Sequence, residues 1–406
     1  MTIQEKYALL GVDGAPGQEC RLTDGPVGPV KESPPPHGAT VDFSHGDVDA
    51  FTPPPGVFKA FASAVEEGGA QAYTEYRGRR DIREGLSAKL SAFTGKKNNP
   101  DEIILTPGTQ GALFLAMGAC VVHGDKVAVV EPDYFANRKL VAFLEGAMLP
   151  VPLDFMDADG RAGIDLGVLE EAFRAGAKVF LFSNPNNPVG AIYSKDELSS
   201  IGLLARRYGV TVIADELYAR QIFDGRQYHH LCAMPEAPDD LITVIGPSKT
   251  ESLSGYRVGV AFGAGEIIER MEKLQAIVSL RCGGYSQAIL RCWFDEPAGW
   301  MEDRVSRHQE IRNDLVQLLR GVDGIEVRPT EAGSYLFIRF PKMTIAMGEF
   351  IGLLRSVGGI TVTHGTEFGY GFGDWFRVNF SQSRAAALAA MRRAVELMEQ
   401  YRDIAI

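Results

Sequence analysis

Short apolar runs alternate with helix-like segments along the chain from about residue 57. Runs of this length, most of them rich in β-branched residues, are typical of strands buried on both faces of a sheet. Six such runs occur, at Ile103–Leu105, Val127–Val130, Lys178–Phe182, Thr211–Ala214, Leu241–Ile245 and Val258–Phe262. The segments between them include three with helical character, at Gly111–Val121, Lys195–Arg207 and Glu266–Leu280. The alternation predicts an α/β fold, a large domain with a mostly parallel sheet flanked by helices, whose ligands gather at the carboxyl ends of the strands.

The pattern changes after about Arg291, where helices and strands no longer alternate regularly. Helices are expected at Met301–Leu319, Met347–Leu354 and Arg384–Tyr401, and strands at Ile325–Val327, Tyr335–Phe340, Ile360–Thr363 and Phe376–Phe380. This composition predicts a smaller α+β domain. Residues 11–55 are rich in proline and glycine and predict an extended arm that crosses a surface. We therefore expect an N-terminal arm joining the small domain (1–50), a large ligand-binding domain (51–290) and a small C-terminal domain (291–406).

The 406-residue chain carries 41 basic and 52 acidic residues, a net charge of −11, which argues against binding to nucleic acid. Its five cysteines are widely spaced, which suggests neither a disulfide framework nor a cysteine zinc site, and we expect no metal. No apolar stretch approaches the length of a membrane helix, and the first ten residues lack a signal-peptide core. We expect a soluble protein of a reducing compartment, the cytoplasm.

Two loop motifs fall where the predicted strands end. Thr106–Ala112 is a glycine-containing turn that opens a helix, whose free N–H groups could bind a phosphate, although many such turns bind nothing. Ser183–Gly190 contains two Asn-Pro steps, which force extended backbone and place an amide side chain at a strand end. A plain turn is the alternative for the second motif, but the doubled step favours function.

Three further motifs contain charged residues. Asp215, in Asp215–Tyr218, follows a strand and could either cap a helix or hold a cationic ring nitrogen. Lys249, in Ser248–Arg257, follows a buried-looking strand among small hydroxyl residues, where a desolvated lysine can form a Schiff base, and Arg257 could pair with a phosphate. Arg377 lies in the apolar strand Phe376–Phe380, where it could bind a carboxylate or pair with an internal acid.

Four of these motifs together resemble, in order and spacing, those of the class I/II aminotransferases: N-P-x-N-P-x-G, D-E-x-Y, S-K-x5-G-x-R and F-R-V-N-F-S. These are fold-type I, aspartate-aminotransferase-like enzymes that depend on pyridoxal 5′-phosphate. The resemblance spans about Phe43 to the C-terminus. It implies that Lys249 forms the Schiff base and shuttles a proton, that Asp215 keeps the pyridine nitrogen protonated, and that Asn187 and Tyr218 contact the ring's 3-oxygen. It assigns the phosphate to Gly108, Thr109, Gln110, Ser248 and Arg257.

The resemblance also implies contacts to the cofactor ring, the substrate and a second subunit. Tyr134 matches an aromatic residue that stacks on the ring, and Tyr73 matches a tyrosine that reaches the neighbouring subunit's phosphate. Gly46 and Arg377 would bind the substrate carboxylate, with Asn187 beside them. Arg281 follows a helix at the place where relatives project residues across a homodimer; it is either a surface arginine or a selector of dicarboxylic substrates.

Four residues depart from the family pattern. Gly246 stands where Ser or Thr is usual, His364 where Pro is usual, and Glu251 where an aromatic residue is common; His45 precedes Gly46. These differences affect the expected substrate more than the chemistry.

The expected activity is transfer of an amino group from an L-amino acid to a 2-oxo acid, with 2-oxoglutarate as the expected acceptor. The same motifs also fit carbon–sulfur β-lyases, other lyases and decarboxylases on this scaffold. A non-catalytic ligand sensor is the remaining alternative, but it needs a basic N-terminal helix-turn-helix, which the proline-rich start does not resemble. The sequence does not name the amino donor.

Overall fold

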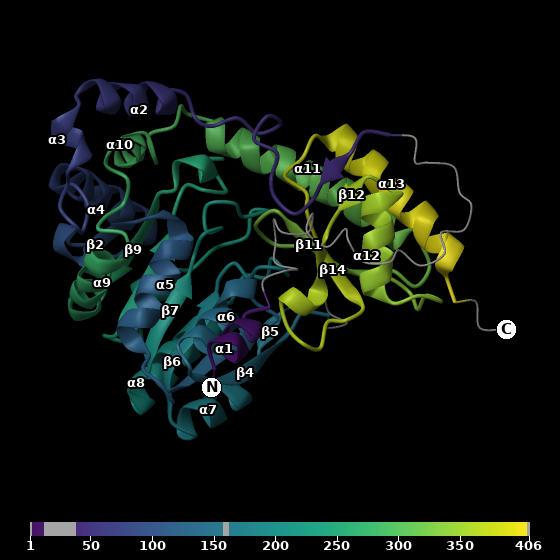
Figure 1. Ribbon diagram of the computed structural model, residues 1–406, viewed down its shortest axis with the longest axis horizontal. Coiled ribbons are helices and arrows are strands. Elements are labelled where there is room, and N and C mark those ends of the chain that lie inside the picture. The colour runs from purple at the N-terminus through teal and green to yellow at the C-terminus, as the bar shows by residue number, and fades with distance from the viewer. Residues whose placement is uncertain (1, 12–37, 157–161, 404–406) are drawn as a thin grey trace.

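The computed structural model describes residues 2–11, 38–156 and 162–403 (Figure 1). An eight-stranded sheet lies at the centre of the larger part, in the order β2-β9-β8-β7-β6-β3-β4-β5. Strands β8, β7, β6, β3 and β4 run parallel, whereas β9 and β5 are antiparallel to their neighbours. The strand bounds are β2 (Ile103–Thr106), β3 (Lys126–Glu131), β4 (Ala147–Asp154), β5 (Gly163–Ile164), β6 (Ala177–Ser183), β7 (Thr211–Asp215), β8 (Leu241–Ile245) and β9 (Gly259–Gly263).

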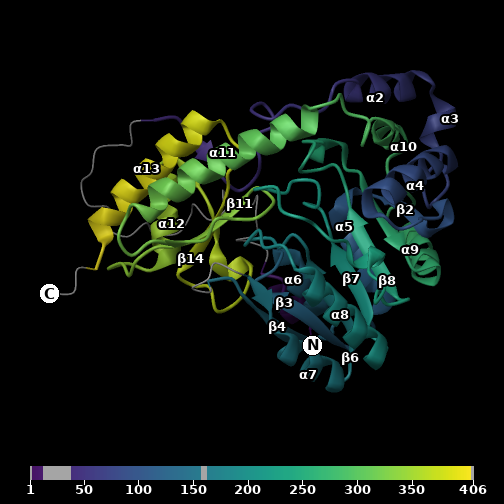
Figure 2. The ribbon, with the colours of Figure 1, turned by 180° about the vertical axis from the view of Figure 1, so that it is seen from behind.

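Helices cover both faces of this sheet (Figures 1 and 2). In β7, Val212 and Ala214 point into the core under α4, α7 and α8, while Ile213 points into the core under α5, α6 and α9. The helices of this part are α2 (Val57–Glu66), α3 (Gly69–Ala72), α4 (Arg80–Thr94), α5 (Gly108–Cys120), α6 (Phe135–Phe143), α7 (Leu166–Arg174), α8 (Lys195–Tyr208), α9 (Gly265–Val278) and α10 (Gly284–Gln287). Burial on two faces explains why the strands read as continuous apolar runs, and it confirms the predicted fold class.

Local sequence signals set the helix ends. At the start of α8, Ser194 Oγ accepts a hydrogen bond from Glu197 N (3.2 Å) and Glu197 Oε2 accepts one from Ser194 N (2.8 Å). This reciprocal cap satisfies N–H groups that have no partner inside the helix. Gly209, with φ of 63°, ends the same helix in the left-handed conformation. The helix therefore extends one residue beyond the predicted Lys195–Arg207.

Strand β4 was not among the strands predicted from the sequence. It contains Pro150 and Pro152, which cannot donate hydrogen bonds within a sheet. The structure accommodates both because β4 lies near the edge, with a full parallel partner only in β3 and a two-residue pairing with β5. Near the edge of a sheet, fewer backbone N–H groups must pair with a neighbouring strand, so proline is tolerated there although it would disrupt a central strand.

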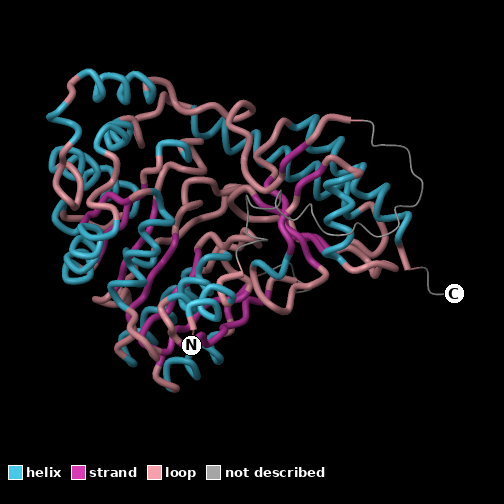
Figure 3. Tube along the Cα trace, in the orientation of Figure 1, coloured by secondary structure: helices cyan, strands magenta, loops and turns pink. Residues whose placement is uncertain are grey.

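The smaller part contains the antiparallel sheet β10-β11-β14-β13 and three helices (Figure 3). The bounds are α11 (Trp300–Arg320), β10 (Glu326–Val327), β11 (Tyr335–Arg339), α12 (Met347–Ser356), β12 (Ile360–Thr361), β13 (Thr363–His364), β14 (Trp375–Asn379) and α13 (Arg384–Tyr401). The strand predicted at Ile360–Thr363 is two short strands, because β12 pairs with β1 (Val41–Asp42) and β13 pairs with β14. Helix α11 extends between the two parts (Figure 2).

Residues 41–51 pack on the smaller part rather than on the large sheet. Phe43 and Phe51 are buried in its core together with side chains of α11, α12 and α13. Most of the proline-rich stretch on which the prediction of an arm rests lies outside the described residues. Within the described ranges, helix α1 (Ile3–Ala8) packs against α6, with Lys6 Nζ 2.9 Å from Glu145 Oε1. No helix in these ranges is both long enough and apolar enough to span a membrane.

Candidate active site

The ends of five strands meet at one edge of the large sheet. Strands β3, β6, β7 and β8 are parallel and present their carboxyl ends there, and β2 points the same way because β9 lies antiparallel between it and β8. The reversed direction of β9 has a consequence for Arg257. Because β9 begins at Gly259, Arg257, two residues before it, lies at the same edge as the carboxyl ends of the other strands. Loops at such an edge are the usual place for a ligand in an α/β sheet.

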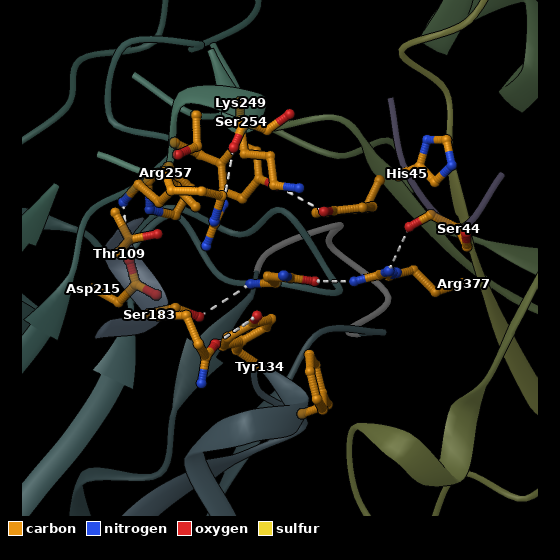
Figure 4. Close-up of a pocket in the computed structure, with 18 residues that line it drawn as sticks. Ser44, His45, Thr109, Tyr134, Ser183, Asp215, Lys249, Ser254, Arg257 and Arg377 are labelled. Carbon is orange, nitrogen blue, oxygen red and sulfur yellow. Dashed lines mark hydrogen bonds between the residues drawn. The ribbon is translucent and has the colours of Figure 1, made fainter. Parts of the chain in front are cut away.

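A cavity of about 310 Å³ lies at this edge, between the two parts of the molecule (Figure 4). Ten of the residues predicted for the site line it: Thr109, Gln110, Tyr134, Asn187, Asp215, Tyr218, Ser248, Lys249, Arg257 and Arg377. Eight further residues complete the lining: Ser44, His45, Phe135, Ser183, Pro185, Leu217, Ser254 and Tyr335. Folding thus brings together residues that are separated by up to several hundred positions in the chain.

One end of the cavity is suited to an anion. Gly108 begins α5 with φ of +75°, and a Cβ on it would lie 2.5 Å from Arg257 Nη2, so only glycine lets the arginine approach this helix N-terminus. Arg257 donates to Ser254 O (2.9 Å). Ser248 Oγ is buried without a hydrogen-bond partner, an arrangement that a bound ligand would complete.

Gly246 does not leave a gap at this end. A Cβ at Gly246 would lie 2.8 Å from Thr109 Cγ2, so the side chain of Thr109 occupies the space that a serine or threonine there would need. Gly246 departs from the family pattern, but the side chain of Thr109 fills the space next to it.

Asp215 ends β7 on the floor of the cavity. It is buried, and its Oδ1 accepts a hydrogen bond from Leu217 N (3.1 Å). Burial raises the pKa of Asp215 to about 7, and the neighbouring charge of Glu216 acts in the same direction, against the Leu217 hydrogen bond. A carboxyl group in this state gains a favourable partner if a cationic nitrogen binds next to it.

We expect Asp215→Asn to remove a pH-dependent destabilisation of the cofactor-free protein. Folding raises the pKa of Asp215 from 3.8 to about 7. Below pH 4 the carboxyl group is protonated in both the folded and the unfolded protein and costs no stability. As the pH rises towards 7 the unfolded protein loses this proton more readily than the folded one, so the free energy of unfolding falls. The variant should match the wild type near pH 4 and exceed its free energy of unfolding by up to about 4 kcal/mol near pH 8. Urea unfolding of both proteins between these pH values measures the difference.

Asp133 also has a pKa raised to about 7, mainly by burial and in part by the charge of Asp215, so Asp215→Asn removes that part as well and adds to the expected difference in the same direction. A difference that does not vary with pH would show that Asp215 is not protonated by burial.

A chain of hydrogen bonds that starts at Asp133 sets the position of Asn187. The carboxylate of Asp133 accepts from Ser183 N (2.9 Å) and from Ser183 Oγ, and Ser183 Oγ accepts from Asn187 N (3.1 Å). Asp133 also accepts from Tyr134 N (2.5 Å), and the Tyr134 hydroxyl donates to Gln110 Oε1 (2.9 Å). Sequence reasoning missed the role of Asp133 because an acid after a strand looks like an ordinary turn residue.

Arg377 is a buried cation that faces the cavity without an acidic partner (Figure 4). It is only 1% exposed; Nη1 donates to Asn187 Oδ1 (3.0 Å), Nη2 donates to Ser44 O (3.2 Å), and Nε has no partner. Among the described residues it forms no ion pair with a carboxylate, so the alternative of an internal salt bridge is wrong. A buried unpaired cation is costly, and the cavity allows an anionic ligand to offset that cost.

Lys249 lies in the loop after β8, beside Ser254 and Arg257 (Figure 4). Its ammonium group makes no hydrogen bond or ion pair with the described residues, so it is available to a ligand in the cavity. Tyr218 lies across from it and donates to the hydroxyl of Tyr335 (2.7 Å). Tyr335 was not predicted for the site, because a tyrosine that opens an apolar strand reads as a packed side chain.

Three of the residues that depart from the family pattern are now placed. Glu251 is fully buried outside the cavity and forms an ion pair with Arg220 (2.5 Å), so its charge does not face the site. His45 lines the cavity, and its hydrogen bond to Asp42 is the main cause that raises its pKa to about 9. His364 accepts from Thr366 N (3.1 Å) and does not line the cavity.

Four predicted residues lie outside the lining of the main cavity: Gly108, which begins α5 next to Arg257, and three others. Gly46 lines an adjoining cavity of about 240 Å³ that shares His45 and Lys249 with the first. Tyr73 is 82% exposed, and the guanidinium carbon of Arg281 lies 5.3 Å from the centre of its ring. Arg281 donates to Thr74 O (2.6 Å), so within one chain both residues face away from the cavity.

Comparison with known proteins agrees with this geometry. The sequence profile described as "Aminotransferase class I and II" matches residues 39–394. The chain is 24% identical over 361 residues to the aspartate aminotransferase of Pyrococcus horikoshii, covering 88% of this chain and 90% of that protein. It is 28% identical over 287 residues to the kynurenine–oxoglutarate transaminase of Dictyostelium discoideum, covering 66% of each chain.

Among solved structures, an aspartate aminotransferase from Rhodobacter sphaeroides superimposes with a TM-score of 0.94 at 56% identity, covering 99% of this chain and 100% of that one. The aspartate aminotransferase of Rhizobium meliloti gives a TM-score of 0.80 at 23% identity, over 89% of this chain and 92% of that one, which shows a shared fold. The prediction drawn from the motifs is confirmed: the chain belongs to the class I and II aminotransferase family and is an aminotransferase.

Proposed function

We propose that this aminotransferase binds pyridoxal 5′-phosphate in the cavity and moves the amino group of an L-amino acid to a 2-oxo acid, with 2-oxoglutarate as acceptor. The observation that carries the proposal is the order of groups in one cavity: an anion-binding end, a buried acid, a free lysine and a buried arginine without an acidic partner.

The residues present fit this cofactor. The N-terminus of α5 with Gly108, Thr109 and Gln110, together with Ser248 and Arg257, would hold the phosphate, and the unpartnered Ser248 Oγ would gain an acceptor. Asp215 would pair with the ring nitrogen, Tyr134 would stack on the ring, and Asn187 and Tyr218 would contact its 3-oxygen. When bound, the cofactor supplies an electron sink for the substrate Cα.

The chain's own groups then carry out binding and proton transfer. Arg377 and the backbone of Gly46 bind the substrate carboxylate, which fixes the Cα–H bond relative to Lys249. Lys249 Nζ would remove the proton from Cα. Asp215 would keep the ring nitrogen protonated, and its buried position would make that interaction stronger than it is in water.

A spectroscopic experiment tests this function. The cofactor-loaded protein is mixed with single L-amino acids and no oxo acid, and conversion to the pyridoxamine form together with one equivalent of 2-oxo acid is the expected result. Release of ammonia and pyruvate would identify a lyase instead, and binding without any conversion would indicate a sensor. A donor screen with 2-oxoglutarate as acceptor then identifies the amino donor.

We also propose a homodimer in which Tyr73 and Arg281 approach the partner's site. Large apolar side chains are exposed around these two residues, including Phe58 on α2 (75% exposed) and Ile277 on α9 (82%). Exposed apolar groups of this size commonly mark an interface. The positions of Tyr73 and Arg281 away from their own cavity support the same arrangement.

Sedimentation equilibrium should show a dimer, and Ile277→Asp should shift it towards monomer with loss of activity, because a charge replaces an apolar contact. Leu203→Asp is the matched control: Leu203 is 53% exposed on α8, away from this surface, and the control should remain dimeric and active. An active wild-type monomer would refute the proposal.

Arg281 should select dicarboxylic substrates across the dimer. Losing a contact between its guanidinium and a second carboxylate costs about 2–5 kcal/mol, so Arg281→Ala should lower kcat/KM for glutamate and aspartate by at least about tenfold. Aromatic and aliphatic donors should be almost unaffected, as should the control Arg270→Ala on the exposed face of α9. Equal effects on both donor classes, or none, would make Arg281 a surface residue.

We further propose that residues 1–50, 51–290 and 291–406 are the arm and the two domains, which the packing of residues 41–51 on the smaller core supports. A cytoplasmic location is proposed as well; the described cysteines, Cys120, Cys232, Cys282 and Cys292, are all free thiols.

A further inference from the structure

Tyr335 places a second buried phenol next to the reacting lysine. It begins β11, is 4% exposed and lines the same cavity as Lys249. Its oxygen accepts the hydrogen of the Tyr218 hydroxyl (2.7 Å), and the two rings meet edge to face with centres 5.5 Å apart. The hydroxyl of Tyr335 is therefore an acceptor within the cavity, and nothing in the function proposed above uses it.

The charges around Tyr335 favour a negative oxygen. The guanidinium carbon of Arg377, from β14, lies 4.1 Å from the centre of its ring, and Lys249 faces it from the loop after β8. The other titratable and charged groups that line this cavity are the phenols of Tyr218 and Tyr134, the carboxyl group of Asp215, the imidazole of His45 and the guanidinium of Arg257. No carboxylate among the described residues pairs with Arg377, and the ring of Tyr335, a group able to carry the opposite charge, packs directly on its guanidinium.

The three phenols of the cavity respond differently to this environment. Burial raises the pKa of Tyr134 and of Tyr218 above the ordinary value. Burial acts on Tyr335 in the same direction, but the charges of Arg377 and Lys249 and the hydrogen bonds with Tyr218 and Asn379 outweigh it, so the pKa of Tyr335 is lowered. Tyr218 thus keeps its proton and donates it, and Tyr335 is the phenol that can lose its own.

We propose that Tyr335 is a positioning residue for the amino-transfer reaction: its ring packs on the guanidinium of Arg377 and, where its phenol is ionised, it takes up a proton from solvent when a substrate carboxylate binds to Arg377. The incoming carboxylate neutralises the guanidinium, which removes the main reason for a negative charge on Tyr335. Once protonated, Tyr335 can donate to Tyr218 Oη, which frees the Tyr218 hydrogen to turn towards another acceptor in the cavity. The inference rests on the carboxylate-binding role proposed for Arg377.

Succinate, an unreactive dicarboxylate, tests the coupling in the cofactor-loaded protein. Calorimetric titrations in two buffers with different ionisation enthalpies count the protons taken up on binding, and Tyr335→Phe should take up fewer than the wild type. Tyrosinate absorbance in the near ultraviolet should fall on succinate binding in the wild type and stay constant in the variant. Tyr193→Phe is the matched control, because Tyr193 is another buried phenol, outside the cavity, and should behave as wild type.

The affinity for succinate should depend on pH in a way that reflects the same proton uptake. The Kd of the wild type should rise by up to about tenfold per pH unit above the pKa of Tyr335 in the free site, because one proton must be taken up with the ligand, and this rise should be weaker in Tyr335→Phe. Tyr218→Phe removes the hydrogen-bond donor but keeps Tyr335, so it should move the rise to higher pH. Equal proton uptake in wild type and Tyr335→Phe, or no displacement in Tyr218→Phe, would overturn the proposal.

The tyrosinate measurement also separates this inference from the proposed function. On protein stripped of cofactor, the difference in signal between wild type and Tyr335→Phe reports Tyr335 without any amino-transfer chemistry, so a signal lost on succinate binding in the wild type alone supports the coupling even if the donor screen detects no amino transfer. An unchanged signal in an active enzyme would refute the coupling alone.

Discussion

Replacing Lys249 by alanine should abolish turnover, with a loss of at least about a thousandfold in kcat, because the variant lacks both the covalent attachment and the base that removes the Cα proton. The protein should still bind the cofactor through its phosphate and ring contacts, but without the absorbance band of the lysine-linked form. Lys249 is the cavity's only lysine within the described residues, so no neighbouring amine can replace it. Absorbance spectra and single-turnover kinetics measure the two effects separately.

Lys273→Ala is the matched control for this substitution. Lys273 is an exposed lysine on α9 that pairs with Glu269 (2.7 Å), and its removal should leave the spectrum and turnover unchanged. Turnover of Lys249→Ala within tenfold of the wild type would contradict the assignment of the cavity as the active site.

Arg377→Lys should reduce kcat/KM for every amino donor, by about 30-fold or more. The substrate carboxylate common to all donors would lose a two-pronged contact that lysine cannot reproduce. Loss of a contact to a buried charge costs about 2–5 kcal/mol, and each 1.4 kcal/mol is about a factor of ten. The effect should appear with dicarboxylic and apolar donors alike, which distinguishes it from the selective effect expected of Arg281. Steady-state kinetics with glutamate and an aromatic donor measures both.

Arg384→Lys serves as the control for Arg377→Lys. Arg384 begins α13 at the surface and pairs with Asp314 (2.6 Å) and Glu310 (3.2 Å), where an exposed ion pair contributes little. Its kinetics should match the wild type. An unchanged kcat/KM in Arg377→Lys would show that another group binds the substrate carboxylate.

Features set by neighbouring residues in the sequence were predictable, whereas features set by contacts between distant residues were not. Helix α13 was predicted with its observed bounds, Arg384–Tyr401, because periodic apolar residues along one helix are a local signal. The lysine, acid and arginine of the site were also predictable, since each lies in a short motif next to a strand. Tyr335 and Asp133 carry no such motif, and the structure alone connects them to Tyr218 and to Asn187.

The sequence by itself determined the alternating α/β pattern, the family and most of the residues predicted for the cavity, because these follow from apolar periodicity and from motifs that are local in the chain. Only the tertiary structure decided that β9 runs antiparallel, which places Arg257 beside Gly108, and that Arg377 pairs with no acid in the part of the chain that the structure describes. It also showed that Glu251 points away from the site towards Arg220. The physical reason is that strand direction, burial and charge pairing depend on contacts between residues far apart in the sequence, which no local pattern records.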